Sequence, residues 1–503
     1  MLTDKDLRDI VTVGIELTAE KDKNKLLEKL MATAMHISGC DAGTLYLYRD
    51  GALEFKIMKT LSMGVSRGER GEKIDLPPVK LKEENVCAFS AIHRELVNIP
   101  DVYTSDRFDF SGPRRYDEIT GYRTGSMLVI PLEEAEGALI GVLQLINKLD
   151  ENGKIISFTK DDEFILESLG AMSAVSLANM IYIEEIKAQM FSFVQAFATA
   201  VDERTPYNGT HTRKVTIYAD LLAKEINRLH RLGEAEESFD PARQEQLVLA
   251  AALHDIGKMI VPLSVMNKAT RLAERLPAVK QRFALLAALY ERDKLKGRIA
   301  PEEYDAAVSC LTKSLAFIEE KDGAGFMPDE ALGTIREIAG HYYEKEDGTK
   351  IPYLTEEETA CLTVRKGTLT NEEWLVMESH AAMTDRILSK VRFNRKYSET
   401  RRFAAAHHEL LNGNGYPNHL TADDLDLEIR ILTVVDVFDA LTCTDRPYKK
   451  PIPRPKAFAI LHDMAKAGQI EDRLVTLLEE ALKDVTAEQI EEMAATEDWW
   501  NTD

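Results

Sequence analysis

The hydrophobic period of this chain changes once, near residue 165, and that change divides the fold. Before it, a helical stretch precedes short alternating or apolar runs, TLYLYRDGALEFKIM, SMLVIPLE and LIGVLQLINK, which glycines and charged turns separate. Such runs are typical of an antiparallel sheet flanked by helices. Beyond residue 200 almost every run has the helical period, and none alternates as a strand does. The chain is therefore predicted to be a multidomain α+β protein whose C-terminal part is an all-α bundle.

With 503 residues, the chain is long enough for roughly two to four domains. We expect a sheet domain over residues 1–163, a linker helix over 164–200, a helical bundle over 201–480, and a C-terminal helix and tail over 481–503. A stretch from about 268 to 364, rich in Lys, Glu and Ala, indicates a helical subdomain inserted into the bundle. Its EKEDGTKIP segment is expected to be a loop.

The linker carries a mostly apolar seam at alternating steps of four and three, in which the polar pair Ser176 and Asn179 would weaken the seam while fixing its register. The positions are Ile165, Leu169, Met172, Ser176, Asn179, Ile183, Ile186, Met190, Phe193, Phe197 and Ala200. This seam predicts a coiled coil with a second copy of the chain, and therefore a parallel homodimer. A single long helix packed on its own domain is the alternative.

The net charge limits the macromolecules that the chain can bind, and the number of cysteines indicates the cellular compartment. The formal net charge of −22 argues against duplex DNA, whose phosphates need a broad basic surface. The five scattered cysteines indicate neither disulfides nor a zinc knuckle, and the start of the chain does not resemble a signal peptide, so we expect a cytoplasmic protein. The apolar stretch 164–183 contains Glu167, Asn179 and three serines, which favours a buried helix over a membrane span.

The run LVLAAALHDIGKMIVP places His254, Asp255 and Lys258 among alanines and leucines, where the helical pattern predicts His254 and Asp255 to lie mid-helix. An ionised carboxylate is costly to bury unless a positive group compensates it, and a metal ion would do so. Four further residues stand in similar apolar helical contexts, His380, His407, His408 and Asp436, while His211 follows the turn TPYNGT and is expected to open a helix. Imidazoles and carboxylates without cysteine suit iron, manganese or zinc, and the set is large enough for two ions that share a bridging carboxylate.

The sequence contains an internal comparison for this pattern. His462 and Asp463 repeat the His-Asp dipeptide without ligand-like neighbours, so the dipeptide alone has little meaning. We interpret His462 as an ordinary residue. The same interpretation applies to His36, His93, His230, His341 and His419.

Four motifs in order, HDIGK (254–258), His380, HHELLNGNGYP (407–417) and DVFDALTCTDRPYKK (436–450), resemble the HD-GYP family. This is a branch of the HD metal-dependent phosphohydrolases that degrades cyclic di-GMP. The resemblance implies two divalent ions, iron or manganese, and a bridging Asp255 that is catalytic together with Lys258. The implied metal ligands are His211, His254, Asp255, His380, His407, His408 and Asp436. The implied substrate contacts are Lys258, Gly415, Tyr416, Pro417, Arg446 and Lys449.

The chain departs from the family pattern at several positions. Tyr207 stands where some members carry a glutamate that helps to hold a third ion, which favours two ions here. Asn412 replaces the usual aspartate, and Leu410 and Leu411 replace a more polar pair. The segment from Asp436 to Arg446 is one residue longer than usual, and the insertion is the last difference.

The N-terminal part resembles a GAF domain, a small-molecule sensor fold. Asn147, Lys148, Phe158, Asp162 and Glu163 match the NKxnFx3DE pattern of GAF domains from cyclic-nucleotide phosphodiesterases. The resemblance implies a mainly structural role for this motif, with a salt bridge between Lys148 and Asp162. A cyclic nucleotide is the small ligand that it suggests.

Together the two resemblances imply a phosphodiesterase that hydrolyses cyclic di-GMP to pGpG under control of a GAF sensor, with a second cut to GMP left open. The altered loop at 410–414 keeps another cyclic dinucleotide, 3′,3′-cyclic GMP-AMP, as an alternative substrate. A metal-loaded protein that binds a cyclic dinucleotide or a partner without turnover is a second alternative. Structural histidines without metal are disfavoured, because Asp255 and Asp436 would then be buried without compensation.

Overall fold

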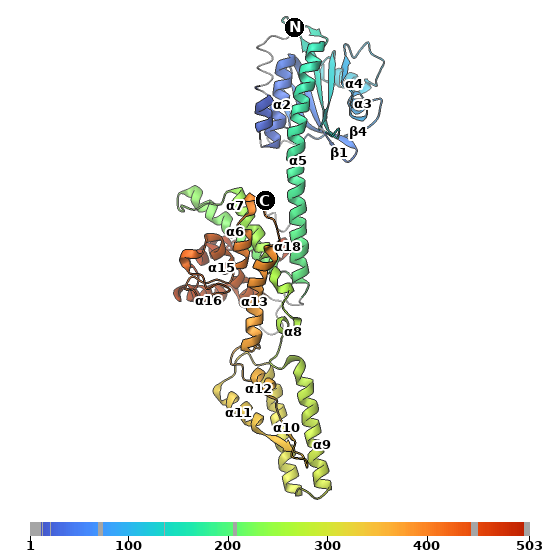
Figure 1. Ribbon diagram of the computed structural model, residues 1–503. Helices are drawn as coiled ribbons and strands as arrows, with labels where there is room; N and C mark the ends of the chain where they lie inside the picture. The colour runs from blue at the N-terminus through green and yellow to red at the C-terminus, as the bar shows by residue number, and fades with distance from the viewer. Residues whose placement is uncertain are drawn as a thin grey trace. The chain divides into compact units, whose positions relative to one another are not determined.

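The computed structural model describes Thr12 and residues 14–20, 22–68, 74–134, 136–204, 209–443 and 451–496. The chain forms two compact units, Met1–Gln189 and Met190–Asp503 (Figure 1). Each unit is described by itself. The finer division expected from the sequence stays a prediction.

The first unit is built on an antiparallel sheet, as predicted. Its main strand order is β3-β2-β1-β7-β6-β5, while β4 pairs with β2 and β8 pairs with β7. The strands are β1 (Cys40–Arg49), β2 (Ala52–Thr60), β3 (Val65–Arg67), β4 (Val79–Lys80), β5 (Val97–Ile99), β6 (Met127–Glu133), β7 (Leu139–Leu149) and β8 (Ile155–Ile156). The helices are α2 (Lys23–Ser38), α3 (Val86–His93), α4 (Ser111–Thr120) and the first part of α5 (Lys160–Asp202).

Helices cover both faces of this sheet, because side chains alternate along its central strands. Leu143 and Leu145 of β7 join a buried cluster with α2 and α5, whereas Val142 packs in a second cluster with α3. Figure 1 shows α2 beside α5, with α3 and α4 across the sheet from them. The sheet is therefore the middle layer of an α/β/α sandwich.

The motif residues of the first unit form a structural joint between β7 and α5. Lys148 forms an ion pair with Asp162, as the resemblance implies. Asp162 Oδ2 also accepts hydrogen bonds from Thr159 N at 2.6 Å and Thr159 Oγ1 at 2.8 Å. Asn147 Oδ1 accepts a hydrogen bond from Gly125 N at 2.7 Å. The Lys148–Asp162 pair ties the sheet to the first turn of α5, and the Asn147 bond ties β7 to the segment before β6.

Asp162→Ala should lower the free energy of unfolding of the first unit by about 2 kcal/mol, because it removes a partly buried ion-pair partner and the hydrogen bonds from Thr159. Denaturant unfolding followed by circular dichroism would measure the change. Glu167→Ala is the matched control, since Glu167 is an exposed acid on the same helix. Equal stabilities of the two variants would contradict a structural role for the joint.

Helix α5 does not present the whole predicted seam. Ile165 and Leu169 are buried in the core of the first unit, so this part of the seam expectation is wrong: α2 and the sheet already cover these positions. Ile183 and Ile186 are 67% and 66% exposed, and Phe193 and Phe197 are exposed as well. The parallel dimer therefore stays a prediction that rests on the C-terminal part of the seam.

Among the described helices, α5 alone is long and apolar enough to cross a membrane by length and composition. Its most apolar window has a mean hydropathy of 1.5, and half of that window is buried inside the protein. Core helices of other proteins pass the same test, so this is weak evidence for a membrane span.

The second unit is a helical bundle around α6, which contacts α7, α15, α17 and α18. Its helices, besides the end of α5, are α6 (His211–Leu232), α7 (Pro241–Leu253), α8 (Leu263–Met266), α13 (Asn371–Leu388), α14 (Thr400–Ala405), α15 (Leu427–Thr442), α16 (Arg454–Lys466), α17 (Asp472–Ala481) and α18 (Ala487–Ala495). The 3-10 helices are η2 (Ile256–Met259), η3 (Ala273–Arg275), η4 (Arg395–Tyr397) and η5 (Ala422–Asp424). Leu222, Leu249 and Phe438 are fully buried in its core.

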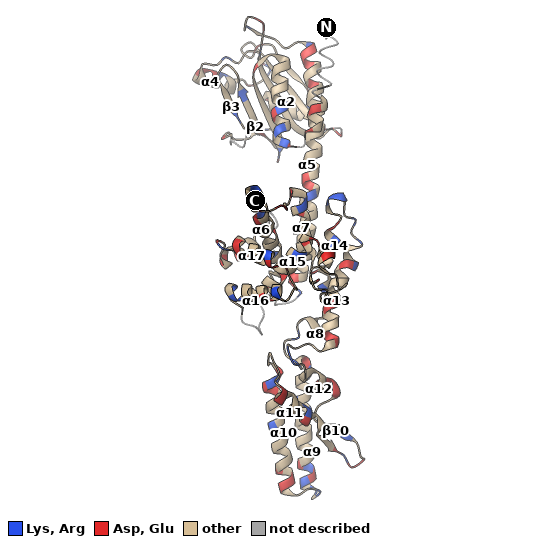
Figure 2. Cartoon of the chain, turned by 90° about the vertical axis from the view of Figure 1, so that its left-hand side faces the viewer, with Lys and Arg blue, Asp and Glu red and all other residues tan. Residues whose placement is uncertain are grey.

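The insertion has a core of its own. It contains α9 (Leu276–Leu295), α10 (Pro301–Asp322), α11 (Asp329–Gly340), β9 (Tyr342–Glu344), β10 (Lys350–Pro352) and α12 (Glu356–Leu362). Strands β9 and β10 pair antiparallel, so the expectation of helices and a plain loop is wrong at this hairpin. Three-residue strands are too short to show alternation in a sequence. Figure 2 shows acidic and basic residues interspersed on α9 and α10.

The two ends of the insertion lie side by side. Thr368 Oγ1 donates a hydrogen bond to Lys268 O at 2.9 Å, and Arg271 Nε donates to Val364 O at 3.1 Å. The Lys268 ammonium also pairs with Glu373 at 2.6 Å. The insertion is thus joined to α8 and α13 through a narrow neck.

Candidate metal centre

The structure brings the predicted ligands together from separate helices of the second unit. His211 opens α6, His380 lies in α13 and Asp436 lies in α15. The expectation that His254 and Asp255 lie mid-helix is wrong, because α7 ends at Leu253 and a 3-10 turn follows. His407 and His408 likewise follow the end of α14. A helix end can aim adjacent side chains into one site, whereas mid-helix neighbours diverge by about 100°.

One group of ligand atoms surrounds Asp255 Oδ2. This oxygen is 3.3 Å from both His211 Nε2 and His254 Nε2. Asp436 Oδ1 is 3.3 Å from His211 Nε2 and 3.9 Å from His254 Nε2. Ligands about 2.1 Å from one ion stand about 3.0 to 3.4 Å apart in octahedral or tetrahedral geometry. The spacing of this group therefore fits one divalent ion.

A second group lies around the other oxygen of Asp255. Asp255 Oδ1 is 3.5 Å from His380 Nε2 and 3.8 Å from His407 Nε2, and these two nitrogens are 3.4 Å apart. Ligand atoms of His380, His407 and His408 lie within 4.8 Å of one another. Asp255 thus presents one carboxylate oxygen to each group, which is the arrangement of a bridging carboxylate.

Backbone carbonyls orient three of the imidazole rings. Nδ1 of His254, His380 and His407 lies 2.6, 2.6 and 2.7 Å from the carbonyl oxygen three residues earlier in each case. An Nδ1–H donor at each position leaves the Nε2 lone pair free for a metal. In the described part of the chain, His254 Nε2 and Asp255 Oδ1 are buried without a hydrogen-bond partner. Buried polar atoms normally have a partner, and a metal cation could be the partner of both this nitrogen and this oxygen.

Burial and charge set the protonation states of the site. Burial holds the pKa of His407 well below its usual value and lowers the pKa of His408 to about 3. Burial acts to raise the pKa of Asp255, but the charges of Lys258 and His254 outweigh it and hold this pKa well below its usual range. Neutral imidazoles beside an ionised carboxylate are the protonation states that bind divalent cations.

Asp439 belongs to the site, and the sequence analysis missed it. Its Oδ2 is 2.6 Å from His211 Nδ1, so it orients this ring as the carbonyls orient the others. Burial acts to lower the pKa of His211, but hydrogen bonds with Asp255, Asp436 and Asp439 raise it overall. The signal was the spacing in DVFDALT, since residues three apart share one face of a helix.

Asp439→Asn should weaken metal binding about 10- to 100-fold while the protein stays folded, because the amide no longer favours the Nδ1–H form of His211. Titration of the metal-free protein with Mn²⁺ would measure this loss. Asp472→Asn is the matched control: Asp472 pairs with Nδ1 of His462 at 2.7 Å, but on the surface. The same loss of affinity in both variants would contradict the role given to Asp439.

The Gly-Tyr-Pro segment lies beside the second group of ligands. The Tyr416 ring is 4.7 Å from the His408 ring and 6.2 Å from the His380 ring. Gly415 is buried where a Cβ atom would overlap the backbone of Glu409. The carboxylate of Glu409 accepts from Asn418 N at 2.7 Å and from Leu420 N at 2.9 Å, which fixes the loop. Pro417 follows Tyr416 in this loop.

Among the described Lys and Arg residues, Lys258 is the one that forms an ion pair with Asp255. Its ammonium group donates to Asp255 Oδ2 from the 3-10 turn. The other predicted cationic contacts, Arg446 and Lys449, and the position of Tyr207 lie outside the described residues. Of the predicted substrate contacts, the structure describes Lys258, Gly415, Tyr416 and Pro417, and their contact with a substrate stays a prediction.

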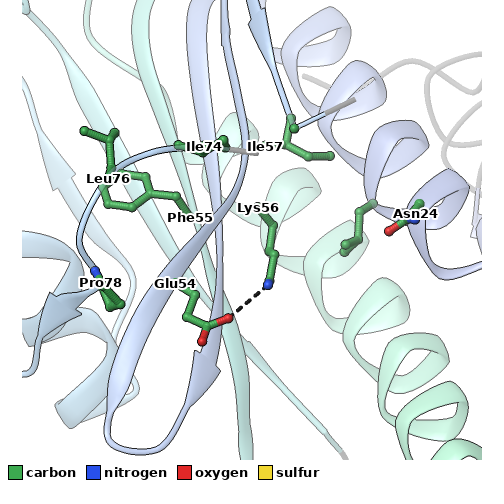
Figure 3. Close-up of a pocket in the computed structure, with 10 residues that line it drawn as sticks. Asn24, Glu54, Phe55, Lys56, Ile57, Ile74, Leu76 and Pro78 are labelled. Atoms are coloured by element: carbon green, nitrogen blue, oxygen red, sulfur yellow. Dashed lines mark ion pairs between the residues drawn. The ribbon is translucent and has the colours of Figure 1, made fainter. Parts of the chain in front are cut away.

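A separate cavity of about 330 Å³ lies in the first unit (Figure 3). It is lined by Asn24 and Leu27 of α2, residues 54–57 of β2, and a segment that includes Ile74, Leu76 and Pro78. Glu54 and Lys56 pair across part of its lining at 2.9 Å. This mixed lining does not define one class of ligand, so a cyclic nucleotide in the first unit stays a prediction.

Models of known families match most of the chain in three segments. A GAF domain model matches residues 22–177, and two HD domain models match residues 208–311 and 356–474. The chain joins a GAF domain to an HD domain. The gap between the two HD matches overlaps the insertion of this GAF–HD protein, and all proposed metal ligands lie within the HD matches.

The curated relatives of the GAF–HD protein include named phosphodiesterases. The 3′3′-cGAMP-specific phosphodiesterase 3 of Vibrio cholerae is 23% identical over 322 residues, 64% of this chain and 45% of the relative. The 3′3′-cGAMP-specific phosphodiesterase 2 of the same organism is 38% identical over 115 residues, 23% of this chain and 21% of the relative. The cyclic di-GMP phosphodiesterase response regulator RpfG of Xanthomonas campestris is 38% identical over 109 residues, 22% of this chain and 28% of the relative. Each match spans less than half of the relative's length.

Proposed function

We propose that the GAF–HD protein is a metal-dependent phosphodiesterase that hydrolyses cyclic di-GMP to pGpG, under control of its GAF domain. One observation carries the proposal: Asp255 directs one oxygen to the imidazoles of His211 and His254 and the other to those of His380 and His407. A single buried carboxylate shared by two sets of imidazoles suits two ions that act on one phosphodiester. The names of the relatives support the same class of substrate.

The ligand types favour iron or manganese as the ions. The proposed set contains imidazoles and carboxylates and no thiolate, although Cys443 lies in the same unit. When bound, two such ions activate water as a nucleophile and neutralise the charge of the phosphodiester.

The chain's own residues supply the rest of the chemistry. The ammonium of Lys258 stands at Asp255, where it can bind a phosphate oxygen and stabilise charge that develops on the leaving ribose oxygen. Tyr416 lies at van der Waals range of His408 and offers an aromatic face to a nucleobase. The helix ends at Leu253 and Ala405 hold the ligands without flexible loops between them.

A second substrate, 3′,3′-cyclic GMP-AMP, is the alternative that the comparisons favour. A relative matched over 322 residues is named for this dinucleotide. The loop that carries Leu410, Leu411 and Asn412 differs from the pattern of the cyclic di-GMP family. Both substrates share the phosphodiester, so the ion sites do not discriminate between them.

The test is turnover by anaerobically purified, metal-loaded protein supplied with either dinucleotide, with the products identified by mass spectrometry. We expect linear pGpG from cyclic di-GMP, with a larger kcat/KM than for cyclic GMP-AMP. The opposite preference would support the alternative substrate. If both dinucleotides stay intact while metal is bound, the hydrolase proposal fails and a binding role replaces it.

Lys258→Met should lower kcat about 100-fold with the metal content unchanged, because it removes charge stabilisation but no ligand. Metal analysis and steady-state kinetics would measure both quantities. Lys466→Met is the matched control, since Lys466 stands in the same place after the surface dipeptide His462-Asp463. A loss of metal in Lys258→Met would contradict this role.

A further inference from the structure

The C-terminal end of α5 is built into the core of the HD unit. Phe191, Val194, Ala198 and Val201 are buried there with residues of α6 and α7. The same helix contributes Leu166, Leu169 and Leu177 to the core of the first unit. One continuous helix therefore belongs to both hydrophobic cores. Two polar residues, Asp202 at the end of α5 and Arg204 in the turn after it, are not used by the chemistry described above.

Asp202 holds the segment that carries His211. Asp202 is 2% exposed, and its Oδ1 accepts a hydrogen bond of 2.7 Å from Thr212 Oγ1. Thr212 is itself fully buried and directly follows His211 in the first turn of α6. A buried hydrogen bond at this place fixes how far the first turn of α6 stands from α5.

Arg204 holds the segment that carries Asp255 and Lys258. Its Nη1 donates to Lys258 O at 3.2 Å and its Nη2 donates to Val261 O at 2.9 Å. The Lys258 carbonyl belongs to the 3-10 turn that follows Asp255, and the Val261 carbonyl lies two residues beyond the end of that turn. A planar guanidinium that binds both carbonyls fixes the turn in one orientation, which the shorter contact of a lysine would not do.

We propose that Asp202 and Arg204 are positioning residues of the metal centre, through which the last residue of α5 and the turn after it set the positions of His211, Asp255 and Lys258. The inference rests on the proposed function only in that the site binds metal. Asp202 contacts the segment that carries His211, and Arg204 contacts the segment that carries Asp255.

The structure offers controls for a merely structural effect. Thr199, one turn earlier on α5, accepts a hydrogen bond of 3.2 Å from Arg213 Nη2 of α6. This bond joins the same two helices but involves neither His211 nor the turn after Asp255. Glu203 lies between the two proposed residues and is exposed. Thr199→Val and Glu203→Ala therefore test interhelical packing and local charge without touching the proposed contacts.

The experiment is titration of the full-length, metal-free protein with Mn²⁺ alone, followed by calorimetry, with thermal unfolding measured in parallel. We expect Asp202→Ala and Arg204→Ala to weaken the binding of Mn²⁺ about tenfold, as for other supports of metal ligands. Thr199→Val and Glu203→Ala should bind Mn²⁺ as the unaltered protein does. Asp202→Asn should restore the affinity, because its amide oxygen still accepts from Thr212.

The inference is overturned if Asp202→Ala binds Mn²⁺ normally, or if Thr199→Val weakens binding to the same extent. Should Asp202→Ala fail to fold, Thr212→Val removes the same hydrogen bond from α6 and decides the question by the same titration. An unaltered protein that binds Mn²⁺ but leaves both cyclic dinucleotides intact refutes the proposed function only. An unaltered protein that does not bind Mn²⁺ refutes both.

Discussion

Asp255→Ala is expected to abolish metal binding and turnover together. Asp255 is the residue whose two oxygens face both groups of imidazoles, so its loss leaves the first group with the Asp436 carboxylate alone and takes the nearest carboxylate oxygen from the second. The imidazoles would then face one another across a buried space, and Lys258 would lose its partner. We expect the metal content to fall to background and kcat/KM to fall at least about a thousandfold, since the ions supply several kcal/mol of transition-state stabilisation.

Asp463→Ala is the control for this prediction, because Asp463 is the aspartate of the second His-Asp dipeptide. Asp463 pairs with Lys466 at 2.9 Å, and both side chains are exposed. This variant should keep the metal content and turnover of the unaltered protein. Inductively coupled plasma analysis and product chromatography would compare the two. Retained turnover in Asp255→Ala would refute the assignment of the bridging carboxylate.

Gly257→Ala is expected to damage the site from outside the ligand set. A Cβ atom at this position would lie 2.6 Å from Thr384 N and would overlap the His380 carbonyl of α13. Both are backbone groups, so the 3-10 turn and α13 must move apart, and Asp255 moves away from His380. We expect a loss of about 3 kcal/mol in the free energy of unfolding and about a 100-fold loss of kcat, since displacements near 1 Å cost that much in catalysis.

A glycine-to-alanine substitution at an open position serves as the control. It distinguishes the effect of close packing at Gly257 from the general effect of alanine on a helix. Gly333 lies inside α11, and a Cβ atom there would meet no other atom within 4 Å. Gly333→Ala should raise the stability slightly, because alanine favours a helix by about 1 kcal/mol over glycine. Chemical unfolding and steady-state kinetics of both variants would test the contrast. Normal metal binding by Gly257→Ala would show that the turn can move without cost.

Residue types and their surroundings predicted the histidines and aspartates that the structure brings together, and their role as metal ligands stays a prediction. Histidine and aspartate inside apolar runs are rare without a cation, so the sequence alone singles out His254, Asp255 and Asp436. The backbone around them was predicted less well. The same alanines and leucines that suggest a continuous helix also fit a helix that ends at Leu253, because the end depends on the contact of Gly257 with α13.

Structural features that depend on contacts between residues far apart in the chain were not predicted from the sequence. Asp439 is recognisable as part of the site only when His211, which is far away in the chain, lies beside it. The apolar seam of α5 was predicted from its hydrophobic period alone. This period does not tell whether a second copy of the chain or the chain's own core covers a given turn of the helix. For Ile165 and Leu169 the partner is the chain's own first core. The hairpin of β9 and β10 was missed because each strand is only three residues long.

The narrow neck of the insertion has a consequence for how such a chain can vary. Lys268 and Thr368 are within one hydrogen bond of each other, although a hundred positions separate them. A tight turn could join them directly, without stretching α8 or α13. The inserted subdomain between them could therefore be deleted without moving α8 or α13. A related chain could gain, lose or replace this subdomain and keep the arrangement of residues around Asp255.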